Sequence, residues 1–344
     1  MQLLGGLSAR TFLRRHWQKR PLFIRAALPQ FRGAVGLRAL LALAARDDVE
    51  SRIVERRGAR WDTAHGPFTS PRAKKRDWTV LVSGLNLHHA QADRLLRRFS
   101  FIPQARLDDV MVSYATPGGG VGPHVDSYDV FLLQASGRRR WTVWESARKT
   151  VRETYVCEPG DLLYLPPGVK HDGVALEPCF TYSIGFRAPR GAELGAAFLD
   201  WLHERGLPDA RYRDPDLAPA RHAARIPPSL VSFAEGTLRR IRWSRADVEA
   251  FLGEYLSMPK PHVVFRPGRS AGDTVHLDLK TQLLYSGKRF FINGEAFTVA
   301  ARSAAALRAL ADERKAARRT LARAGLNDLI SEWQRRGYLW MRNG

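Results

Sequence analysis

Short runs of apolar and β-branched residues, separated by glycine and proline, dominate the chain from Trp78 to Phe186. This pattern is typical of strands rather than helices. The expected strands lie in residues 78–87, 108–116, 125–134, 138–145, 154–159, 161–167 and 179–186. Short strands at such close spacing predict a β-sandwich or a β-barrel for this half of the chain.

Helical patterns flank the strand-rich block. A capped helix is expected from Ser8 to about His16, stopped before Pro21 and followed by a short strand. After Phe186 the helical pattern returns, and Ser244 is a suitable N-cap for a later helix. The expected helices cover residues 8–16, 192–206, 245–256, 303–313 and 326–337, and a proline-bearing connection covers 212–229.

Two further strand segments, 275–285 and 288–299, are expected near the end, and Asn293-Gly294 predicts a type I′ hairpin turn. We place domain boundaries near residues 190 and 258, where the pattern changes. The sequence therefore predicts an α+β protein with domains over residues 1–190, 191–257 and 258–344.

The chain carries 55 Lys and Arg against 34 Asp and Glu, a net charge of +21, and only nine of the basic residues are lysines. A basic surface of this kind fits a nucleic-acid or ribonucleoprotein partner. The same composition also arises when a GC-rich genome replaces lysine by arginine on solvated surfaces, so both explanations stay open. No segment reaches the roughly 20 apolar residues of a membrane helix, and arginines interrupt the start of the chain, so export is not expected. Cys157 and Cys179 lack metal-binding spacing and are expected to be buried thiols in a reducing cytoplasm.

A candidate metal site lies in the strand-rich block. His124 and Asp126 are two residues apart, so in a strand both side chains project from one face. His171, which follows a proline turn, is the candidate third ligand. Two histidines and one carboxylate that leave open positions form the arrangement of non-haem Fe(II) oxygenases. A surface aspartate beside a hydrogen-bonding histidine is the plainer alternative, but the glycine-rich approach, expected to let backbone pass close to a ligand, favours the metal site.

Arg139 is the candidate anchor for an anionic co-substrate. After the turn at Ser136-Gly137 the chain is expected to return as an antiparallel strand, with Arg139, Trp141 and Val143 on its interior face. A buried guanidinium requires an anionic partner. The distal carboxylate of 2-oxoglutarate would satisfy it with two hydrogen bonds. An ion pair with an Asp or Glu of the protein is the alternative.

These residues resemble the JmjC-type, or cupin, 2-oxoglutarate oxygenases. More closely, the chain is similar to the bacterial ribosomal oxygenases that hydroxylate an arginine of a large-subunit ribosomal protein. The segment GGGVGPHVDSYDVFLLQASGRRRW, residues 118–141, carries the most specific part of the likeness. The likeness extends over essentially the whole chain through FLRRHWQKRPLFIR (residues 12–25), WTVLVSGLNLHH, DDVMVSY, PPGVKHDGVALE and YSIGFRAP.

The resemblance implies that His124, Asp126 and His171 bind Fe(II), and that Arg139 binds 2-oxoglutarate, with Ser113 and Ser183 as smaller contacts to it. For both serines a hydroxyl bonded to the sheet backbone is the alternative. The resemblance also implies a double-stranded β-helix (cupin/JmjC) core, a helical dimerisation region and a C-terminal winged-helix-like domain. Dioxygen would be the oxidant of an unactivated carbon of the substrate.

The resemblance further implies a homodimer acting on a ribosomal protein, and the free thiols favour the cytoplasm. Contact of the basic surface with ribosomal RNA is one account of the positive charge. Dimerisation would use Phe251, Leu252 and their neighbours as an exposed stripe, unless these pack on the catalytic domain. Acidic residues near the barrel mouth would have to receive a basic substrate: Asp108, Asp109 or Asp129. Two other functions stay open, namely an oxygenase that demethylates or hydroxylates a different protein or RNA, and a non-catalytic nucleic-acid-binding protein.

Overall fold

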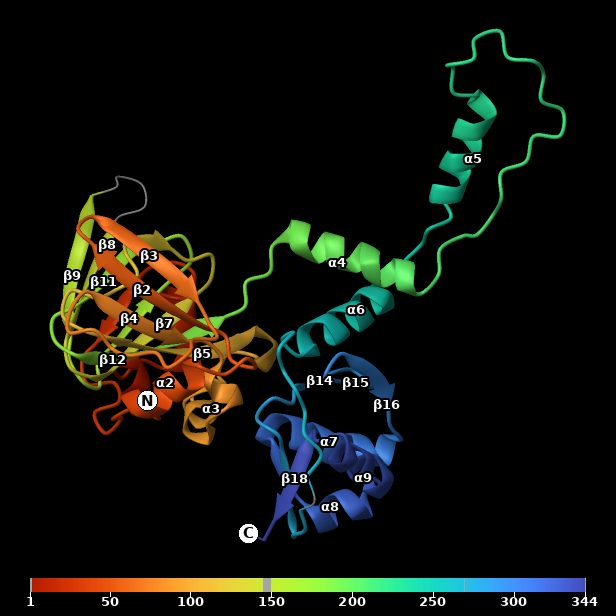
Figure 1. Ribbon diagram of the computed structural model, residues 1–344. Helices are drawn as coiled ribbons and strands as arrows, with labels where there is room; N and C mark the ends of the chain where they lie inside the picture. The colour runs from red at the N-terminus through yellow and green to blue at the C-terminus, as the bar shows by residue number, and fades with distance from the viewer. Residues whose placement is uncertain (1, 145–149, 269, 344) are drawn as a thin grey trace.

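The computed structural model describes residues 2–144, 150–268 and 270–343. Figure 1 shows a β-rich N-terminal domain, a helical region that reaches away from it, and a C-terminal domain of short strands and helices. Helix α6 (Arg245–Ser257) leads from the helical region into the C-terminal domain. Among the described residues no helix is both long and apolar enough to cross a bilayer.

The described residues of the N-terminal domain form two sheets. In both sheets, strands that are far apart in the sequence lie next to each other. The larger sheet has the order β1-β10-β7-β12-β5-β4-β2-β3, and the smaller sheet has the order β6-β11-β8-β9. The strands are β1 (Leu22–Ile24), β2 (Ser51–Arg57), β3 (Arg60–His65), β4 (Trp78–Val82), β5 (Leu107–Ala115), β6 (His124–Val125), β7 (Val130–Ser136), β8 (Arg139–Trp144), β9 (Val151–Cys157), β10 (Leu162–Leu165), β11 (Lys170–Ala175) and β12 (Cys179–Phe186).

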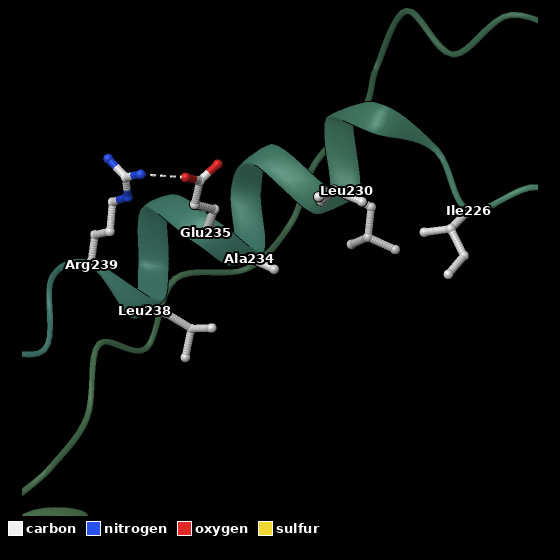
Figure 2. Close-up of a pocket in the computed structure, with 7 residues that line it drawn as sticks. Ile226, Leu230, Ala234, Glu235, Leu238 and Arg239 are labelled. Atoms are coloured by element: carbon white, nitrogen blue, oxygen red, sulfur yellow. Dashed lines mark ion pairs between the residues drawn. The ribbon is translucent and has the colours of Figure 1, made fainter.

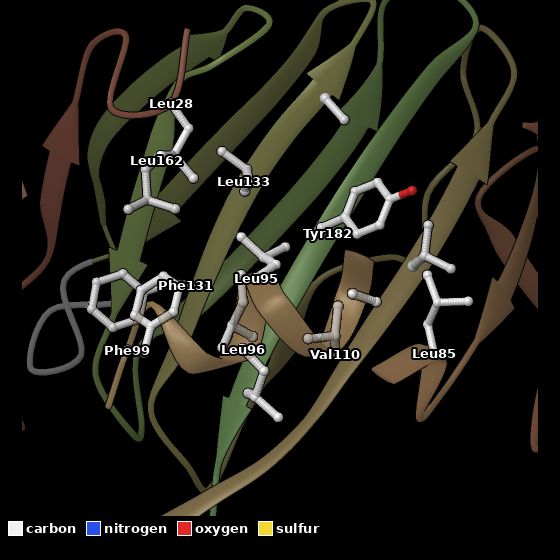
Figure 3. Close-up of a cluster of buried hydrophobic side chains, with 14 of the residues drawn as sticks. Leu28, Leu85, Leu95, Leu96, Phe99, Val110, Phe131, Leu133, Leu162 and Tyr182 are labelled. Atoms are coloured by element: carbon white, nitrogen blue, oxygen red, sulfur yellow. The ribbon is translucent and has the colours of Figure 1, made fainter. Parts of the chain in front are cut away.

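Alternation along the strands divides the apolar side chains between two cores. On β7, Phe131 and Leu133 pack toward the N-terminal helices, whereas Val130 and Leu132 point between the two sheets. The helices over the larger sheet are α1 (Ala9–Arg15), α2 (Leu37–Ala44) and α3 (Ala90–Arg97). Figure 3 shows α3 lying over the sheet, with its leucines among the side chains of the strands. The large core therefore lies outside the barrel, and the space between the sheets remains for the site.

Most predicted elements of this domain are confirmed. Ser8 caps α1 by accepting the Thr11 amide, and β1 follows the proline. The segment 78–87 is only half strand, because its end forms the 3₁₀ helix η2 (Leu85–Leu87). The 3₁₀ turns η1 (Gln2–Leu4) and η3 (Gln104–Arg106), helices α2 and α3, and the β2–β3 hairpin were not predicted from the pattern. Both cysteines are buried and unpaired, and burial raises the pKa of Cys157 to about 12.

Strand β8 returns in the other sheet rather than beside β7. It is antiparallel to β11 and β9, so the chain crosses between the sheets at the Ser136-Gly137 turn. Gly137 has a φ of 60°, and a Cβ there would come within 2.2 Å of the Pro178 carbonyl oxygen. Only glycine fits this crossing. Glu145, the last residue of the expected strand, lies outside the described residues.

The helical region consists of α4 (Gly191–Glu204), α5 (Pro228–Leu238) and α6. Ser244 caps α6 in a capping box with Asp247, as predicted. The expected exposed stripe on α6 is wrong at Phe251, which is 4% exposed and packs on Trp201 of α4. Phe251 is therefore neither exposed to solvent nor packed on the catalytic domain. The strongly exposed apolar residues of this region lie instead on α4, α5 and the segments flanking α5.

In its described residues, 258–268 and 270–343, the C-terminal domain contains two three-stranded sheets and three helices. One sheet has the order β17-β13-β18 and the other β14-β15-β16. The elements are β13 (Thr274–Leu277), β14 (Leu283–Ser286), β15 (Arg289–Ile292), β16 (Glu295–Thr298), α7 (Ala301–Glu313), β17 (Lys315–Ala317), α8 (Arg318–Arg323), α9 (Asn327–Arg335) and β18 (Leu339–Arg342). The segment 275–285 thus forms two strands in different sheets.

Positive φ angles of 50° at Asn293 and 90° at Gly294 confirm the predicted hairpin turn between β15 and β16. Helix α6 packs on the neighbouring strand β15, where a Cβ on Gly253 would come within 2.3 Å of the Phe291 ring. The boundaries at residues 190 and 258 stay predictions. Because α6 rests on the C-terminal sheet, the second boundary does not separate two independent packing units.

Candidate metal centre

The structure brings His124, Asp126 and His171 together at one end of the smaller sheet. His124 on β6 is the register partner of His171 on β11, so the two imidazoles stand side by side on one face. The Nε2 atoms of His124 and His171 lie 3.8 and 3.6 Å from the two oxygens of Asp126. One ligand atom from each residue falls within 4.8 Å of the others. The alternative of an isolated surface aspartate beside one histidine does not describe this arrangement.

Backbone carbonyls set the orientation of both imidazoles. The Nδ1 atom of His124 lies 2.9 Å from the Gly122 carbonyl oxygen, and Nδ1 of His171 lies 2.9 Å from that of Val169. A carbonyl only accepts, so each Nδ1 carries the proton and each Nε2 offers a lone pair toward Asp126. Burial lowers the pKa of His171, as does the neighbouring His124. Both effects favour the neutral imidazole that a metal requires.

This donor set fits a divalent metal of the ferrous type. Two neutral imidazole nitrogens and one carboxylate on a single face leave other coordination positions open toward the cavity. Carbonyl acceptors behind the ligating histidines are the usual outer support of such sites. The role of the three residues as ligands stays a prediction, and the geometry that it requires is present.

Arg139 lies on β8 at the inner end of the same cavity. It is only 4% exposed, and its Nε and Nη2 atoms are buried with no hydrogen-bond partner. Its Nη1 lies 3.4 Å from the Ser113 hydroxyl oxygen, and its guanidinium is 5.7 Å from the Trp141 ring centroid. Among the residues that the structure describes, no carboxylate forms an ion pair with it. The alternative of an internal Asp or Glu partner is therefore not found, and two donors point at a place for an anion.

The two predicted serines differ in their surroundings. Ser113 on β5 is buried, donates a long 3.5 Å hydrogen bond to the Thr181 carbonyl and receives Arg139. The bond to Thr181 agrees with the alternative of a hydroxyl bonded to the sheet backbone. The contact with Arg139 agrees with the expectation that Ser113 lies beside the co-substrate. Ser183 on β12 lines the cavity with His124 and Arg139. The cavity that these residues share measures about 510 Å³.

The glycine-rich approach packs closely against the protein backbone. A Cβ on Gly119 would come within 2.4 Å of the Trp78 carbonyl oxygen, and one on Gly120 within 2.5 Å of that of Gly173. The expectation that these glycines let backbone approach a ligand stays a prediction. They let the loop pass between the edges of the two sheets, which brings His124 to its position beside β11.

Acidic residues line the cavity away from Arg139. Asp108 and Asp109 on β5 belong to the lining, and burial raises the pKa of Asp109. Asp129 does not belong to it, so its placement near the barrel mouth is wrong. It is completely buried and accepts hydrogen bonds from the Tyr164 hydroxyl at 2.6 Å and the Gln18 amide at 3.0 Å. Asp129 therefore stabilises the contact between the N-terminal segment and the sheet.

Sequence reasoning missed several residues of the cavity lining, and three of them bear on its chemistry or its origin. Tyr128 stands near Asp126 and Asp109, and its pKa is raised to about 12 by burial and by these carboxylates, so its phenol stays protonated. Met111 occupies the same strand face as Asp109 and Ser113, and this alternation was a usable signal. Lys260 comes from the segment after α6, and nothing local in the sequence indicates that it reaches this cavity.

Comparisons with known proteins agree with this fold and site. Residues 94–194 match the JmjC domain family, and residues 240–339 match the ROXA-like winged helix family. A relative from Escherichia coli strain K12, ribosomal protein uL16 3-hydroxylase, is 36% identical over 272 residues, which cover 74% of this chain and 73% of that protein.

The chain belongs to the ribosomal oxygenase family. The predicted family and the predicted cupin and winged-helix fold are thus confirmed. Another ribosomal oxygenase relative, a probable one from Haemophilus influenzae, is 38% identical over 203 residues, covering 53% of this chain and 50% of that protein. The crystallised ribosomal oxygenase YcfD of E. coli, in complex with cobalt and 2-oxoglutarate, has a TM-score of 0.80 and 32% identity over 97% of this chain and 98% of that chain. Its complex with cobalt and succinic acid has a TM-score of 0.83.

Proposed function

We propose that this protein is an Fe(II)- and 2-oxoglutarate-dependent oxygenase that hydroxylates an arginine of a large-subunit ribosomal protein. One observation carries the proposal: a single cavity has the His124, Asp126 and His171 ligand face and the unpaired guanidinium of Arg139. The E. coli relative named for uL16 hydroxylation and the YcfD complex with cobalt and 2-oxoglutarate support it. Ferrous iron bound there would supply the activation of dioxygen.

The residues of this chain would bind and orient the reactants. His124, Asp126 and His171 would hold the metal, and Arg139 would receive the distal carboxylate of 2-oxoglutarate through its free Nε–H and Nη2–H. The Ser113 and Ser183 hydroxyls would contact the co-substrate from the neighbouring strands. Asp108 and Asp109, which line the cavity, would receive the guanidinium of the substrate arginine, and this would allow a basic enzyme to bind a basic protein.

The proposal is tested with purified E. coli uL16. Incubation with the enzyme, Fe(II), 2-oxoglutarate and dioxygen is expected to add one oxygen atom, about 16 Da, to one arginine-containing peptide. Mass spectrometry of the digested protein locates the change, and omission of 2-oxoglutarate is the control. An unchanged uL16 with modification of another protein or RNA would favour the alternative oxygenase function. Absence of any 2-oxoglutarate turnover would favour the non-catalytic alternative.

We propose that the protein acts in the cytoplasm as a homodimer joined through the helical region. Helix α5 exposes an apolar face, on which Val231 is 53% and Leu238 65% exposed. Ile226, just before the helix, is 68% exposed. Figure 2 shows Ile226, Leu230 and Leu238 along the side of the helix that faces away from the Glu235–Arg239 ion pair. An isolated helix of 11 residues is marginal in water. A second copy covering this face would supply the missing packing, and Figure 1 shows α5 standing clear of both domains.

The dimer is tested by sedimentation. The wild-type protein is expected to sediment as a dimer, whereas Leu238→Glu places a charge in the interface and weakens association by about 100-fold or more. Ser232→Glu is the matched control, because helical spacing puts Ser232 on the polar face with Glu235 and Arg239. A dimer that survives Leu238→Glu would remove α5 from the interface.

We also propose that the C-terminal domain contacts ribosomal RNA. On the outer face of the β17-β13-β18 sheet, His276 lies between Lys315 and Trp340 in register. The His276 and Trp340 rings are stacked with centroids 4.4 Å apart, and the Arg342 guanidinium is 5.6 Å from the Trp340 ring. Aromatic rings flanked by cations on a sheet are the usual support for single-stranded bases.

Fluorescence anisotropy with a single-stranded RNA oligonucleotide checks this contact. Trp340→Ala is expected to weaken binding about tenfold, and Lys315→Met is expected to reduce the slope of log K against log salt by about 0.7. Lys288→Met, an exposed lysine on the β14–β15 turn, is the control. Equal affinity of the wild type and both test variants would place any RNA contact elsewhere.

A further inference from the structure

Lys260 reaches the candidate substrate cavity from outside the N-terminal domain. It lies three residues after the end of α6, in the segment that leads into the C-terminal domain. Its Nζ is 3.4 Å from Oδ1 of Asp108 and 3.5 Å from Oδ2 of Asp109. The side chain is only 26% exposed and shares the cavity with His124 and Asp126. The Lys260 ammonium, which comes from the segment leading into the C-terminal domain, thus forms ion pairs with both aspartates of the cavity.

The carboxylates that Lys260 contacts have few other cationic partners. Asp109 accepts the Gly84 amide at 2.8 Å, and Asp108 lies 3.5 Å from Nε of Arg187. Burial raises the pKa of Asp109, and the charge of Lys260 acts in the opposite direction. The ammonium therefore offsets the cost of keeping two adjacent carboxylates ionised in a partly closed cavity.

A substrate guanidinium would need the same oxygen atoms. We propose that Lys260 is a tethered internal competitor, displaced from Asp108 and Asp109 when the substrate arginine enters, and that it thereby sets the selectivity for arginine. An arginine offers a planar fork of donors and is weakly hydrated, whereas a lysine of the substrate would only replace one ammonium by another. This inference rests on the proposed function.

The side chain can leave without separating the domains. Arg187 donates from Nη1 to the Leu256 carbonyl oxygen at 2.7 Å, and Gln104 donates to the Ala311 carbonyl oxygen at 3.2 Å. These contacts join the N-terminal domain to α6 and to α7 without Lys260. The flexible stem of a lysine allows its ammonium to move to solvent while the backbone stays in place.

The test measures binding of E. coli uL16 to enzyme loaded with Mn(II) and the unreactive analogue N-oxalylglycine at pH 8. Lys260→Met is expected to bind uL16 about fivefold more tightly than the wild type, as expected for loss of one half-buried ion pair. Lys260→Arg, which keeps the cation, is expected to bind no more tightly than the wild type. Lys288→Met is the control on the same domain.

Two further arms separate competition from a docking role. In an Asp109→Asn background, Lys260→Met is expected to change the Kd by a smaller factor, because the shared partner is lost. A uL16 variant with lysine at the modified arginine is expected to gain more from Lys260→Met than wild-type uL16 does. A residue that only docks the C-terminal domain would instead weaken binding of both forms when replaced.

The outcomes distinguish failure of the competitor role of Lys260 from failure of the proposed hydroxylase function. If the wild type hydroxylates uL16 while Lys260→Met binds it equally or more weakly, the competitor role is overturned and the proposed function stands. If no form of the enzyme binds or hydroxylates uL16, the proposed function fails and the inference fails with it. Tighter binding by Lys260→Met, together with hydroxylation of uL16 by the wild type, supports both.

Discussion

Replacing His124 or Asp126 with alanine is expected to abolish 2-oxoglutarate turnover while the protein stays folded. Each change removes one donor from a set whose atoms lie within 4.8 Å of one another, so the remaining two donors bind the metal at least about 100-fold more weakly. Both side chains are partly exposed at the cavity, so their loss leaves no large void in the core. Succinate formation and titration with Mn(II) measure the two effects.

His65→Ala is the control for this experiment, because His65 is an exposed histidine on β3. It is expected to change neither metal affinity nor turnover. Circular dichroism and thermal unfolding establish that all variants share the wild-type fold. Turnover by His124→Ala or Asp126→Ala at the wild-type rate would remove that residue from the ligand set.

Arg139→Met is expected to raise the KM for 2-oxoglutarate by about 100-fold or more with little change in metal affinity. Two charge-assisted hydrogen bonds, each worth about 1.5–3 kcal/mol, would be lost with the guanidinium. Methionine fills a similar apolar volume beside Trp141, so the cavity wall stays in place. Steady-state kinetics at varied 2-oxoglutarate and a separate metal titration give the two numbers.

The same substitution has an opposite effect on the protein without co-substrate. Nε and Nη2 of Arg139 are buried and unbonded, so removal of this charge is expected to stabilise that form by about 1 kcal/mol or more. The rise in Tm that 2-oxoglutarate gives the wild type is expected to disappear. Arg138→Met is the matched control, because Arg138 is exposed and pairs with Glu177 at 3.0 Å. A larger loss of metal binding than of co-substrate binding would contradict the role of Arg139.

Much of the site could be predicted because its residues are close in sequence or follow strand periodicity. The spacing of His124 and Asp126 predicted that they meet, although Asp126 lies just past the end of β6. The alternation of β8 gave the interior position of Arg139. Trp141 is buried beside it, as the apolar pattern indicated. His171 was reached only as a histidine following a later strand, and the pairing of β6 with β11 explains why it faces His124.

Other features depend on contacts that no local pattern encodes. Phe251 was expected at a surface because its helix has an apolar stripe, yet α4 covers it with Trp201. The apolar pattern of α6 indicates that this face is covered by another element, but it does not indicate which element covers it. The residues next to Asp129 in the sequence are those of an exposed loop. In the structure, however, Asp129 is buried and bonded to Tyr164 and Gln18.

The sequence by itself determined the positions of the short strands, the helix caps at Ser8 and Ser244, the hairpin turn at Asn293-Gly294, and the pairing of His124 with Asp126. Each of these depends on residues within a few positions of one another, where backbone geometry fixes which side chains meet. Only the tertiary structure decided that β8 crosses into the second sheet, that Gly118, Gly119, Gly120 and Gly122 pack against protein, and that Lys260 enters the cavity of another domain. These outcomes depend on side chains more than 100 residues apart or on the packing of whole sheets, which the order of residues does not specify locally.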